Sequence, residues 1–436
     1  MGAGPREIAL RVLRRVEEGA YVNLALDGEC TRARLTPPDR RLATALVYGV
    51  LKGRARLDHA LAALAPRGLG GIDATTLDLL RLGALQVLDL RVPAHAAVGE
   101  TVGLLRARRG AGLAGFANAL LRRLAREGAP PPPAAPPSAR ISVRTGAPEV
   151  VVETAIARLG EVEAEALLLA EAAPAPMWLR ASPRRAPDLA ALASELGATP
   201  SSLLVGALRL RAGDGLFDHA AYLEGRVTVQ DLGAQLVGAL VGARPGERVL
   251  DACAGVGGKS TQLAEAMDDR GALDAVDRSA RKLELGQEHA RRLGLTVVRP
   301  RQADLLEAPL EGGYDRALLD APCTGLGVAR RHPEVRLRRG DASVAELASL
   351  QARLLDRVAD QVRAGGRLVY AVCTYTDEEG AAQIARFLER RPDYARDDDT
   401  PIPEALRGRG APGELRTWPH RDDADAFFAA SLRRRS

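Results

Sequence analysis

Apolar residues recur at helical spacing along the first 128 residues of the chain. Two apolar helix faces are marked by Ile8, Val12 and Val16 and by Leu77, Leu80, Ala84 and Leu88. Gly19 and Gly128 follow such stretches and are expected to end helices. The pattern therefore predicts an all-α domain over residues 1–128.

The pattern changes twice after this domain. Residues 129–137 contain six prolines, which lack an N–H donor and fix φ, so residues 129–139 are expected to form an extended linker. The next part of the chain mixes two helical stretches with two strand-like runs, at 150–173, 187–196, 177–181 and 207–211. This mixture predicts a small α+β domain over residues 140–225.

Short apolar strands alternate with helical stretches after residue 225. The expected strands are 248–252, 272–276, 296–298, 316–319 and 367–372. Alternation of this kind is typical of a parallel, doubly wound sheet with helices on both faces. Residues 226–436 are therefore predicted to form a Rossmann-like α/β domain, in which ligands bind beyond the carboxyl ends of the strands.

The first of these strands leads into a glycine-rich turn at residues 251–260. Its glycines would let backbone N–H groups approach a ligand at the N-terminus of the following helix. The sequence Gly258-Lys259-Ser260 resembles the end of a Walker A motif, but that motif needs glycine where this chain has Cys253. The turn therefore argues against an NTPase and favours a nucleoside cofactor.

Acidic residues follow the next two strands. Asp277 lies 22 residues beyond Gly255, where a carboxylate can accept hydrogen bonds from two ribose hydroxyls. Asp304 follows the third strand, where it could contact an adenine amino group or cap the next helix. These residues leave both NAD and S-adenosylmethionine open as cofactors.

Three of the four cysteines directly follow strands. There is no CxxC pair, so neither a zinc site nor a disulfide is predicted. Cys323 and Cys373 follow strands four and five, which in the usual order of such sheets are neighbours about 4.8 Å apart, so both thiols are expected to face one pocket. Hydride transfer needs no such pair. Methylation of cytosine at C5 does, because a thiolate must add to C6 before C5 can attack a sulfonium methyl group, and a second polar group then assists release.

Charge is unevenly divided along the chain. Residues 1–140 carry a net charge of +9 and residues 141–436 a net charge of −4, within a total of +5. The basic part suggests that the helical domain binds a polyanion. No apolar run approaches the roughly 18 residues of a membrane span, and residues 1–9 lack the apolar region of a secretory signal. We therefore expect a soluble cytoplasmic protein, and we expect it to be a monomer.

The residues at the strand ends resemble those of the RNA cytosine-5 methyltransferases of the RsmB/Sun type, within the RsmB/NOP group related to Nop2 and NSUN proteins. The matching stretches are 227–231, 251–259, 320–323, 325–333, 373–380 and 418–428. The helical domain is similar to NusB at 6–9, 46–51, 92–95 and 116–123. The resemblance covers nearly the whole chain.

The resemblance implies S-adenosylmethionine as cofactor, no metal, and a cytosine of 16S small-subunit ribosomal RNA as substrate. It implies that Cys373 is the nucleophile, that Cys323 helps to release the product and that Asp320 contacts the N3 edge of cytosine. The residues implied to line the cofactor are Cys253, Ala254, Gly255, Val256, Gly257, Gly258, Lys259, Asp277, Asp304 and Asp320.

Two stretches depart from the family pattern without removing a reacting group. Gly255-Val256 stands where Ala-Pro is usual, and residues 374–380 lack the usual proline and asparagine. The first departure bears on cofactor affinity and the second on the positioning of Cys373.

The substrate side of the prediction depends on arginines. The target base must be flipped out or lie in a loop, with phosphates held by basic side chains. The candidates are Arg330, Arg331, Arg336, Arg338 and Arg339 beside the pocket and Arg106, Arg108, Arg109, Arg122, Arg123 and Arg126 on the helical domain.

Three other functions remain open at this point. One is cytosine-5 methylation of transfer RNA. Another is a non-catalytic NusB-like RNA-binding or antitermination factor, which would leave both strand-end thiols without a role. The third is a nicotinamide-dependent oxidoreductase, which should bind NAD and not S-adenosylmethionine.

Overall fold

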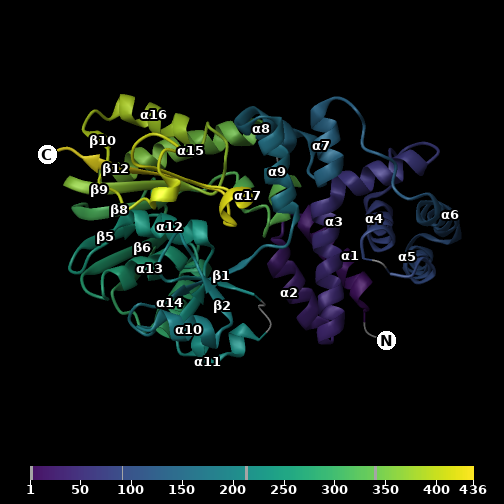
Figure 1. The fold of residues 1–436 in the computed structure, drawn as a ribbon, viewed down its shortest axis with the longest axis horizontal. Coiled ribbons are helices and arrows are strands. Elements are labelled where there is room, and N and C mark those ends of the chain that lie inside the picture. The colour runs from purple at the N-terminus through teal and green to yellow at the C-terminus, as the bar shows by residue number, and fades with distance from the viewer. Residues whose placement is uncertain (1–2, 91, 212–214, 338–340) are drawn as a thin grey trace. The chain divides into compact units, whose positions relative to one another are not determined.

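The computed structural model describes residues 3–90, 92–211, 215–337 and 341–436 (Figure 1). The described residues form two compact units. The first comprises residues 1–174 together with 329–339, and the second comprises the rest of the chain. No helix among the described residues is long and apolar enough to span a membrane.

The first unit begins with helices packed around one apolar core. These are α1 (Pro5–Glu17), α2 (Val22–Arg32), α3 (Pro37–Leu64), α4 (Ala74–Leu88), α5 (Ala94–Arg109) and α6 (Ala111–Glu127). The side chains of Thr36 and Asp73 cap α3 and α4 by accepting backbone N–H bonds. Gly128, with φ of 75°, ends α6, whereas α1 ends at Glu17, two residues before Gly19. The predicted all-α domain is confirmed.

Three more helices belong to the first unit. They are α7 (Pro137–Thr145), α8 (Glu149–Leu159) and α9 (Glu161–Ala172). α7 begins inside the expected linker, and the single helix expected over 150–173 is broken at Gly160, which has φ of 77°. Gly146, after α7, approaches the backbone of Lys52 in α3 so closely that a Cβ atom would clash with the Lys52 carbonyl. This close packing explains why the contacts group residues 140–174 with the helical unit and not with the predicted α+β domain, whose limits stay predictions.

The second unit begins with a small antiparallel sheet. Its strand order is β2-β3-β1-β4, from β1 (Met177–Ala181), β2 (Ala198–Pro200), β3 (Ala207–Leu210) and β4 (Val227–Val229). Helices α10 (Leu189–Glu195) and α11 (Ala220–Leu223) accompany it. The expected strands at 177–181 and 207–211 are present, and the sheet continues past residue 225 through β4.

The large sheet of the second unit has the order β10-β12-β9-β8-β5-β6-β7, with β11 paired to β12. Its strands are β5 (Arg248–Asp251), β6 (Ala272–Asp277), β7 (Val298–Gln302), β8 (Tyr314–Asp320), β9 (Val362–Val372), β10 (Tyr394–Arg396), β11 (Glu414–Thr417) and β12 (Phe427–Arg434). The five strands from β9 to β7 are parallel, as predicted. The remaining strands are antiparallel, so the sheet is mixed and the expectation of a parallel sheet is corrected at this edge.

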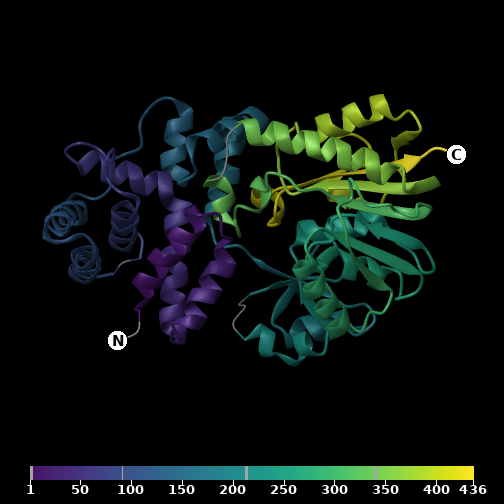
Figure 2. The same cartoon turned by 180° about the vertical axis from the view of Figure 1, so that it is seen from behind.

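Helices cover both faces of the large sheet (Figures 1 and 2). α12 (Leu232–Val241), α13 (Gly258–Ala266) and α14 (Ala280–Leu293) share one apolar core with the sheet, and α15 (Asp341–Ala359) and α16 (Ala381–Arg390) share another. A short helix, α17 (Pro419–Asp422), precedes β12. The third strand lies at 298–302 and not at 296–298, because Pro300 is tolerated in this edge strand although it interrupts the apolar pattern. The predicted doubly wound architecture is confirmed.

Candidate active site

The turn after β5 is held by hydrogen bonds from the neighbouring strand. The Gly255 N–H donates to Asp277 Oδ2 at 3.0 Å, and the Ser279 N–H donates to Asp277 Oδ1 at 2.8 Å. Gly257 has φ of 79°, and a Cβ atom there would lie 2.9 Å from the Cα of Gly286 in α14. Glycine is therefore required at this turn for helix packing as well as for backbone conformation.

Below the turn, Asp251 is buried at the end of β5. Its Oδ2 accepts a 2.6 Å hydrogen bond from the Ser260 hydroxyl at the start of α13. Burial raises the pKa of Asp251 to about 6, although the bond from Ser260 opposes that shift. Asp251 thus ties the end of the strand to the helix that begins at the turn.

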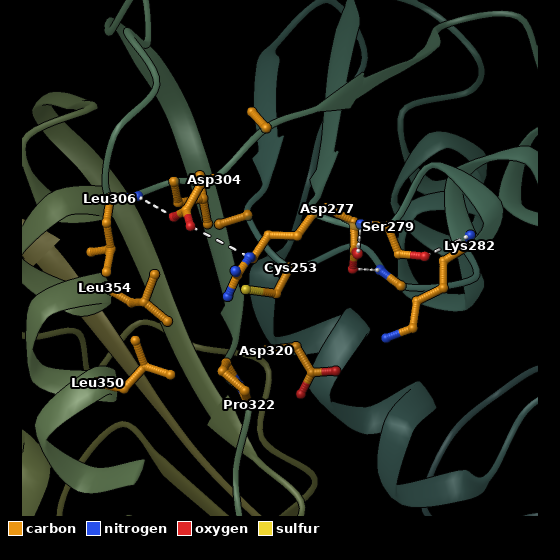
Figure 3. A pocket seen from close by; sticks show the side chains of 15 residues that line it. Cys253, Asp277, Ser279, Lys282, Asp304, Leu306, Asp320, Pro322, Leu350 and Leu354 are labelled. Carbon is orange, nitrogen blue, oxygen red and sulfur yellow. Dashed lines mark hydrogen bonds and ion pairs between the residues drawn. The ribbon is translucent and has the colours of Figure 1, made fainter. Parts of the chain in front are cut away.

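A cavity of about 590 Å³ lies beside this turn, at the carboxyl ends of the parallel strands (Figure 3). Its lining includes Cys253, Gly255, Asp277, Asp304 and Asp320, which are among the residues that the family resemblance implies for the cofactor. Its other lining includes cationic Arg278 and Lys282 and the apolar side chains of Leu305, Leu306, Pro322, Leu350 and Leu354. A cavity with both carboxylates and apolar walls is suited to a molecule that combines ribose hydroxyls, a cation and a flat base.

The remaining predicted cofactor residues do not line this cavity. They are Ala254, Val256, Gly257, Gly258 and Lys259. The Ala254 N–H is bonded to the Val276 carbonyl, and Val256 is 53% exposed and borders a different hollow. Their positions follow from the tight turn, which directs Ala252, Cys253 and Gly255 toward the cavity.

Asp304 lies at the cavity and also accepts N–H groups of the residues that follow it. It lines the cavity, while its Oδ1 accepts the Leu306 N–H at 3.0 Å and its carbonyl accepts the N–H groups of Glu307 and Ala308. The element that it caps is a turn and not a helix. Its Oδ2 also lies 3.4 Å from Arg278 Nε across the cavity.

The two strand-end thiols lie together, as predicted. β8 and β9 are adjacent, with Asp320 paired to Ala371, and the sulfur atoms of Cys323 and Cys373 are 3.4 Å apart. The hydrogen bond with Cys373, together with burial, raises the pKa of the Cys323 thiol well above its ordinary value. Cys323 is therefore held in its protonated form, and either sulfur can donate in the Cys323–Cys373 hydrogen bond.

Lys259 joins the thiol pair to the cavity. Its Nζ lies 2.7 Å from Asp320 Oδ2 and 5.1 Å from the centre of the Phe427 ring. Burial disfavours the charged amine, but the charge and hydrogen bond of Asp320 outweigh burial and raise the pKa of Lys259. The charge of Cys373 contributes in the same direction, so a thiolate at Cys373 would lie within the field of this ammonium.

The predicted phosphate-binding arginines beside the pocket require a correction. Arg336 is 1% exposed and lies 2.6 Å from Glu171, and Arg330 is buried and donates to the Pro174 carbonyl, both within the first unit. Neither side chain is available to a phosphate. Arg338 and Arg339 lie outside the described residues, and Arg331 is partly exposed. The six candidate arginines on α5 and α6 are all exposed.

Sequence reasoning missed one group of buried polar residues beneath the thiols. Glu379, Gln351 and Thr324 are almost completely buried and are hydrogen-bonded to one another. A glutamate beside Glu378 in a run of polar residues gives no sign that it is buried. The only signal in the sequence was the expected proximity of Cys373 to Cys323, which could have suggested that a buried polar group holds both loops.

Comparison with known proteins identifies the family. Residues 239–433 match the family described as 16S rRNA methyltransferase RsmB/F, and residues 3–126 match the NusB family. The chain is 38% identical over 437 residues to ribosomal RNA small subunit methyltransferase B of Thermus thermophilus, covering 100% of this chain and 99% of the relative. It is 33% identical to the probable ribosomal RNA small subunit methyltransferase B of Bacillus subtilis, covering 99% and 98%. The chain belongs to the RsmB/F family of 16S rRNA methyltransferases. Its methyl donor is S-adenosylmethionine.

Solved structures share the fold. The crystal structure of PH0851 superposes with a TM-score of 0.83 at 23% identity and covers 99% of both chains. NSun6 from Pyrococcus horikoshii with SFG superposes with a TM-score of 0.59 at 20% identity, over 66% of this chain and 98% of that chain. The fold expectation is thereby supported over the whole chain.

Proposed function

We propose that this protein forms 5-methylcytosine at a specific cytosine of 16S ribosomal RNA through a covalent bond between Cys373 and C6. The observation that carries the proposal is the thiol pair, with sulfur atoms 3.4 Å apart, next to an aspartate that lines the cofactor cavity. Methyl transfer to an oxygen or an exocyclic nitrogen would need no thiol, because those atoms are nucleophiles already.

The cavity has the groups that S-adenosylmethionine requires. We assign Asp277 to the ribose hydroxyls, because its carboxylate faces the cavity while backbone N–H groups hold it in place. Asp304, with Leu305 and Leu306, is assigned to the adenine end. When bound, the cofactor supplies an electrophilic methyl group on a sulfonium sulfur.

The reaction begins at Cys373. Its sulfur forms a bond to C6 of cytosine, and ring electron density moves to C5, which then takes the methyl group. Asp320 is assigned to the N3 edge of the base, since Lys259 occupies its Oδ2 and, among the described residues, no protein group is bonded to its Oδ1. As the sulfur adds to C6, a proton on Asp320 Oδ1 passes to N3 in this assignment, and the Lys259 ammonium stabilises the carboxylate that is left.

Release of the product is assigned to Cys323. The proton on C5 passes to solvent water, and the electron pair of the C6–S bond returns to Cys373. We assign the Cys323 thiol as the donor of a hydrogen bond to that sulfur, which stabilises it as the leaving group. The two cysteines therefore have distinct roles.

RNA binding is assigned to the helical unit. The exposed arginines of α5 and α6 face solvent on a domain with excess positive charge, and arginine is well suited to phosphate oxygens. Several are already paired within the unit, as Arg108 is with Glu7 and Arg109 with Asp73. These exposed pairs are weak enough for a phosphate to compete for the guanidinium.

A methylation assay tests the proposal. The purified protein is incubated with labelled S-adenosylmethionine and unmodified 16S ribosomal RNA, and 5-methylcytosine is then mapped by bisulfite sequencing. We expect a single modified cytosine in a loop. Modification of transfer RNA and not of 16S RNA would overturn the substrate assignment, and label on an atom other than C5 would overturn the covalent mechanism.

A further inference from the structure

Glu379 is a buried carboxylate directly beneath the two thiol-bearing loops. It follows Cys373 by six residues, its side chain is 0% exposed, and it touches neither the cofactor cavity nor the cysteine sulfurs. The proposed reaction gives it no chemical step. A buried carboxylate is costly unless its oxygens are fully bonded, so its presence calls for a reason.

Each carboxylate oxygen of Glu379 accepts two hydrogen bonds from uncharged donors. Oε1 accepts the Thr324 N–H at 2.7 Å and Gln351 Nε2 at 3.0 Å. Oε2 accepts the hydroxyls of Thr324 at 2.5 Å and Thr376 at 2.7 Å. Thr324 directly follows Cys323 and Thr376 lies three residues after Cys373, so one carboxylate binds both thiol loops.

Further bonds close the network around the same loops. Gln351, from α15, also donates to the Pro322 carbonyl at 2.9 Å, which fixes the residue before Cys323. The hydroxyls of Thr324 and Thr374 lie 2.7 Å apart and link the residues that directly follow the two cysteines. Tyr370 donates to the Glu379 carbonyl at 2.7 Å and anchors the glutamate to β9.

We propose that Glu379 is the positioning residue that sets the distance between Cys323 and Cys373. Given the proposed function, this distance determines how closely the releasing thiol approaches the nucleophile, and therefore the release of the product. Glu379 acts through Thr324 and Thr376 and does not touch the substrate. Without the carboxylate, four donors lose their acceptor, and the two loops lose the group that they share.

Three variants test the inference. Glu379→Ala removes the acceptor. Glu379→Gln keeps the shape and one carbonyl oxygen, and its amide can donate to the threonine hydroxyls, which accept as well as donate. Glu378→Gln is the matched control, because Glu378 is the exposed neighbour in the same stretch.

Two measurements are made on protein shown to be folded by its melting curve. One is kcat and KM for S-adenosylmethionine and RNA. The other is the rate at which a thiol oxidant such as diamide forms the Cys323–Cys373 disulfide, mapped by mass spectrometry. The second rate depends on the separation of the thiols and on their thiolate fraction, so it is measured across pH and compared at its high-pH plateau, and it needs no methyl transfer.

For Glu379→Ala we expect kcat to fall about 100-fold, the loss typical of a misplacement of about 1 Å, with both KM values changed less than about threefold. Disulfide formation should slow about tenfold. Glu379→Gln should recover most of both rates, and Glu378→Gln should match the wild type.

Two results would overturn the inference. One is a folded Glu379→Ala protein with wild-type kcat. The other is lost activity with an unchanged rate of disulfide formation, which would show that the thiols had not moved. If Glu379→Ala does not fold, Glu379→Gln decides by the same two rates. Failure of the proposed function would appear as an inactive wild type, and the disulfide rates would still test the positioning role.

Discussion

The two halves of the candidate site are built in different ways, although they share one edge of the same sheet. On the cofactor side, Asp277 and Asp304 are held by N–H groups two residues away or on the adjacent turn. On the thiol side, the cysteine loops are held by Glu379 and Gln351. Glu379 bonds to Thr376, three residues away, and the other bonds join residues 28 to 55 positions apart in the sequence. The comparison indicates that each aspartate of the cofactor half is held mainly by N–H groups of turns, whereas one carboxylate joins the two loops of the thiol half.

This difference fits the tasks of the two halves. A cofactor that binds reversibly tolerates small displacements, because its affinity is distributed over many contacts along the cavity. Covalent attack does not, because the sulfur must reach one carbon atom in the correct geometry. Changes on the thiol side should therefore lower kcat, and changes on the cofactor side should raise the KM for S-adenosylmethionine.

The largest effect is expected for the cysteines themselves. Cys373→Ala should reduce methylation on the order of 10³-fold or more, as loss of a covalent nucleophile does in other enzymes. Cys323→Ala should also stop turnover, but it should accumulate a covalent protein–RNA adduct, because addition still occurs and release does not. Denaturing gels with labelled RNA distinguish the two outcomes.

A third cysteine provides the control for this pair. Cys30 is buried in the helical core of the first unit, so Cys30→Ala should leave methylation per folded molecule unchanged. Equal, adduct-free loss of activity in Cys373→Ala and Cys323→Ala would contradict the separate roles.

The next largest effect is expected where the two halves meet. Lys259→Met removes the ammonium that lies 2.7 Å from Asp320 but keeps the length of the side chain. A hydrogen bond to a charged group contributes about 1.5–3 kcal/mol, so kcat/KM should fall about 10- to 100-fold. Lys282→Met, at the exposed rim of the cavity, should change it less than about threefold. A similar loss in both variants would show that Lys259 serves only as one positive charge near the cavity.

The same contrast explains how much could be predicted from the sequence. Asp277, Asp304 and the thiol pair follow strands, and the order of strands in a doubly wound sheet brings strand ends together. The burial of Glu379 could not be predicted, because Thr324 and Gln351, which donate hydrogen bonds to its carboxylate, lie on other elements. Asp377 and Glu378, which precede it, are exposed, and they would suggest a surface position for Glu379 as well.

Two further differences have physical causes of the same kind. The antiparallel strand β12 has the apolar character of the parallel strands, and the direction of pairing is not encoded in that character. Arg336 belongs to an arginine-rich stretch, which resembles an exposed basic surface, but its partner Glu171 comes from α9, 165 residues earlier. In both cases the missing information is tertiary.

The smallest effect is expected when a carboxylate of the cofactor half is replaced. Asp277 and Asp304 should differ here, because both oxygens of Asp277 but only one oxygen of Asp304 accept a backbone N–H. Asp277 accepts a different N–H at each oxygen, so Asp277→Asn turns an amide N–H₂ toward one of these donors and leaves it unbonded. That unbonded N–H destabilises the free and the cofactor-bound protein alike, whereas the lost charge on the acceptor for the ribose hydroxyls weakens binding by about 1.5–3 kcal/mol, so the Kd for S-adenosylmethionine should rise about tenfold or more. In Asp304→Asn, the amide oxygen can still accept the Leu306 N–H, so the rise should be about threefold or less.

Calorimetric titration gives both Kd values, and kcat at saturating cofactor should stay within about twofold of wild type in both variants. A tenfold lower kcat in Asp277→Asn would mean that the turn after β5 also positions the thiols, and the two halves would then form a single network.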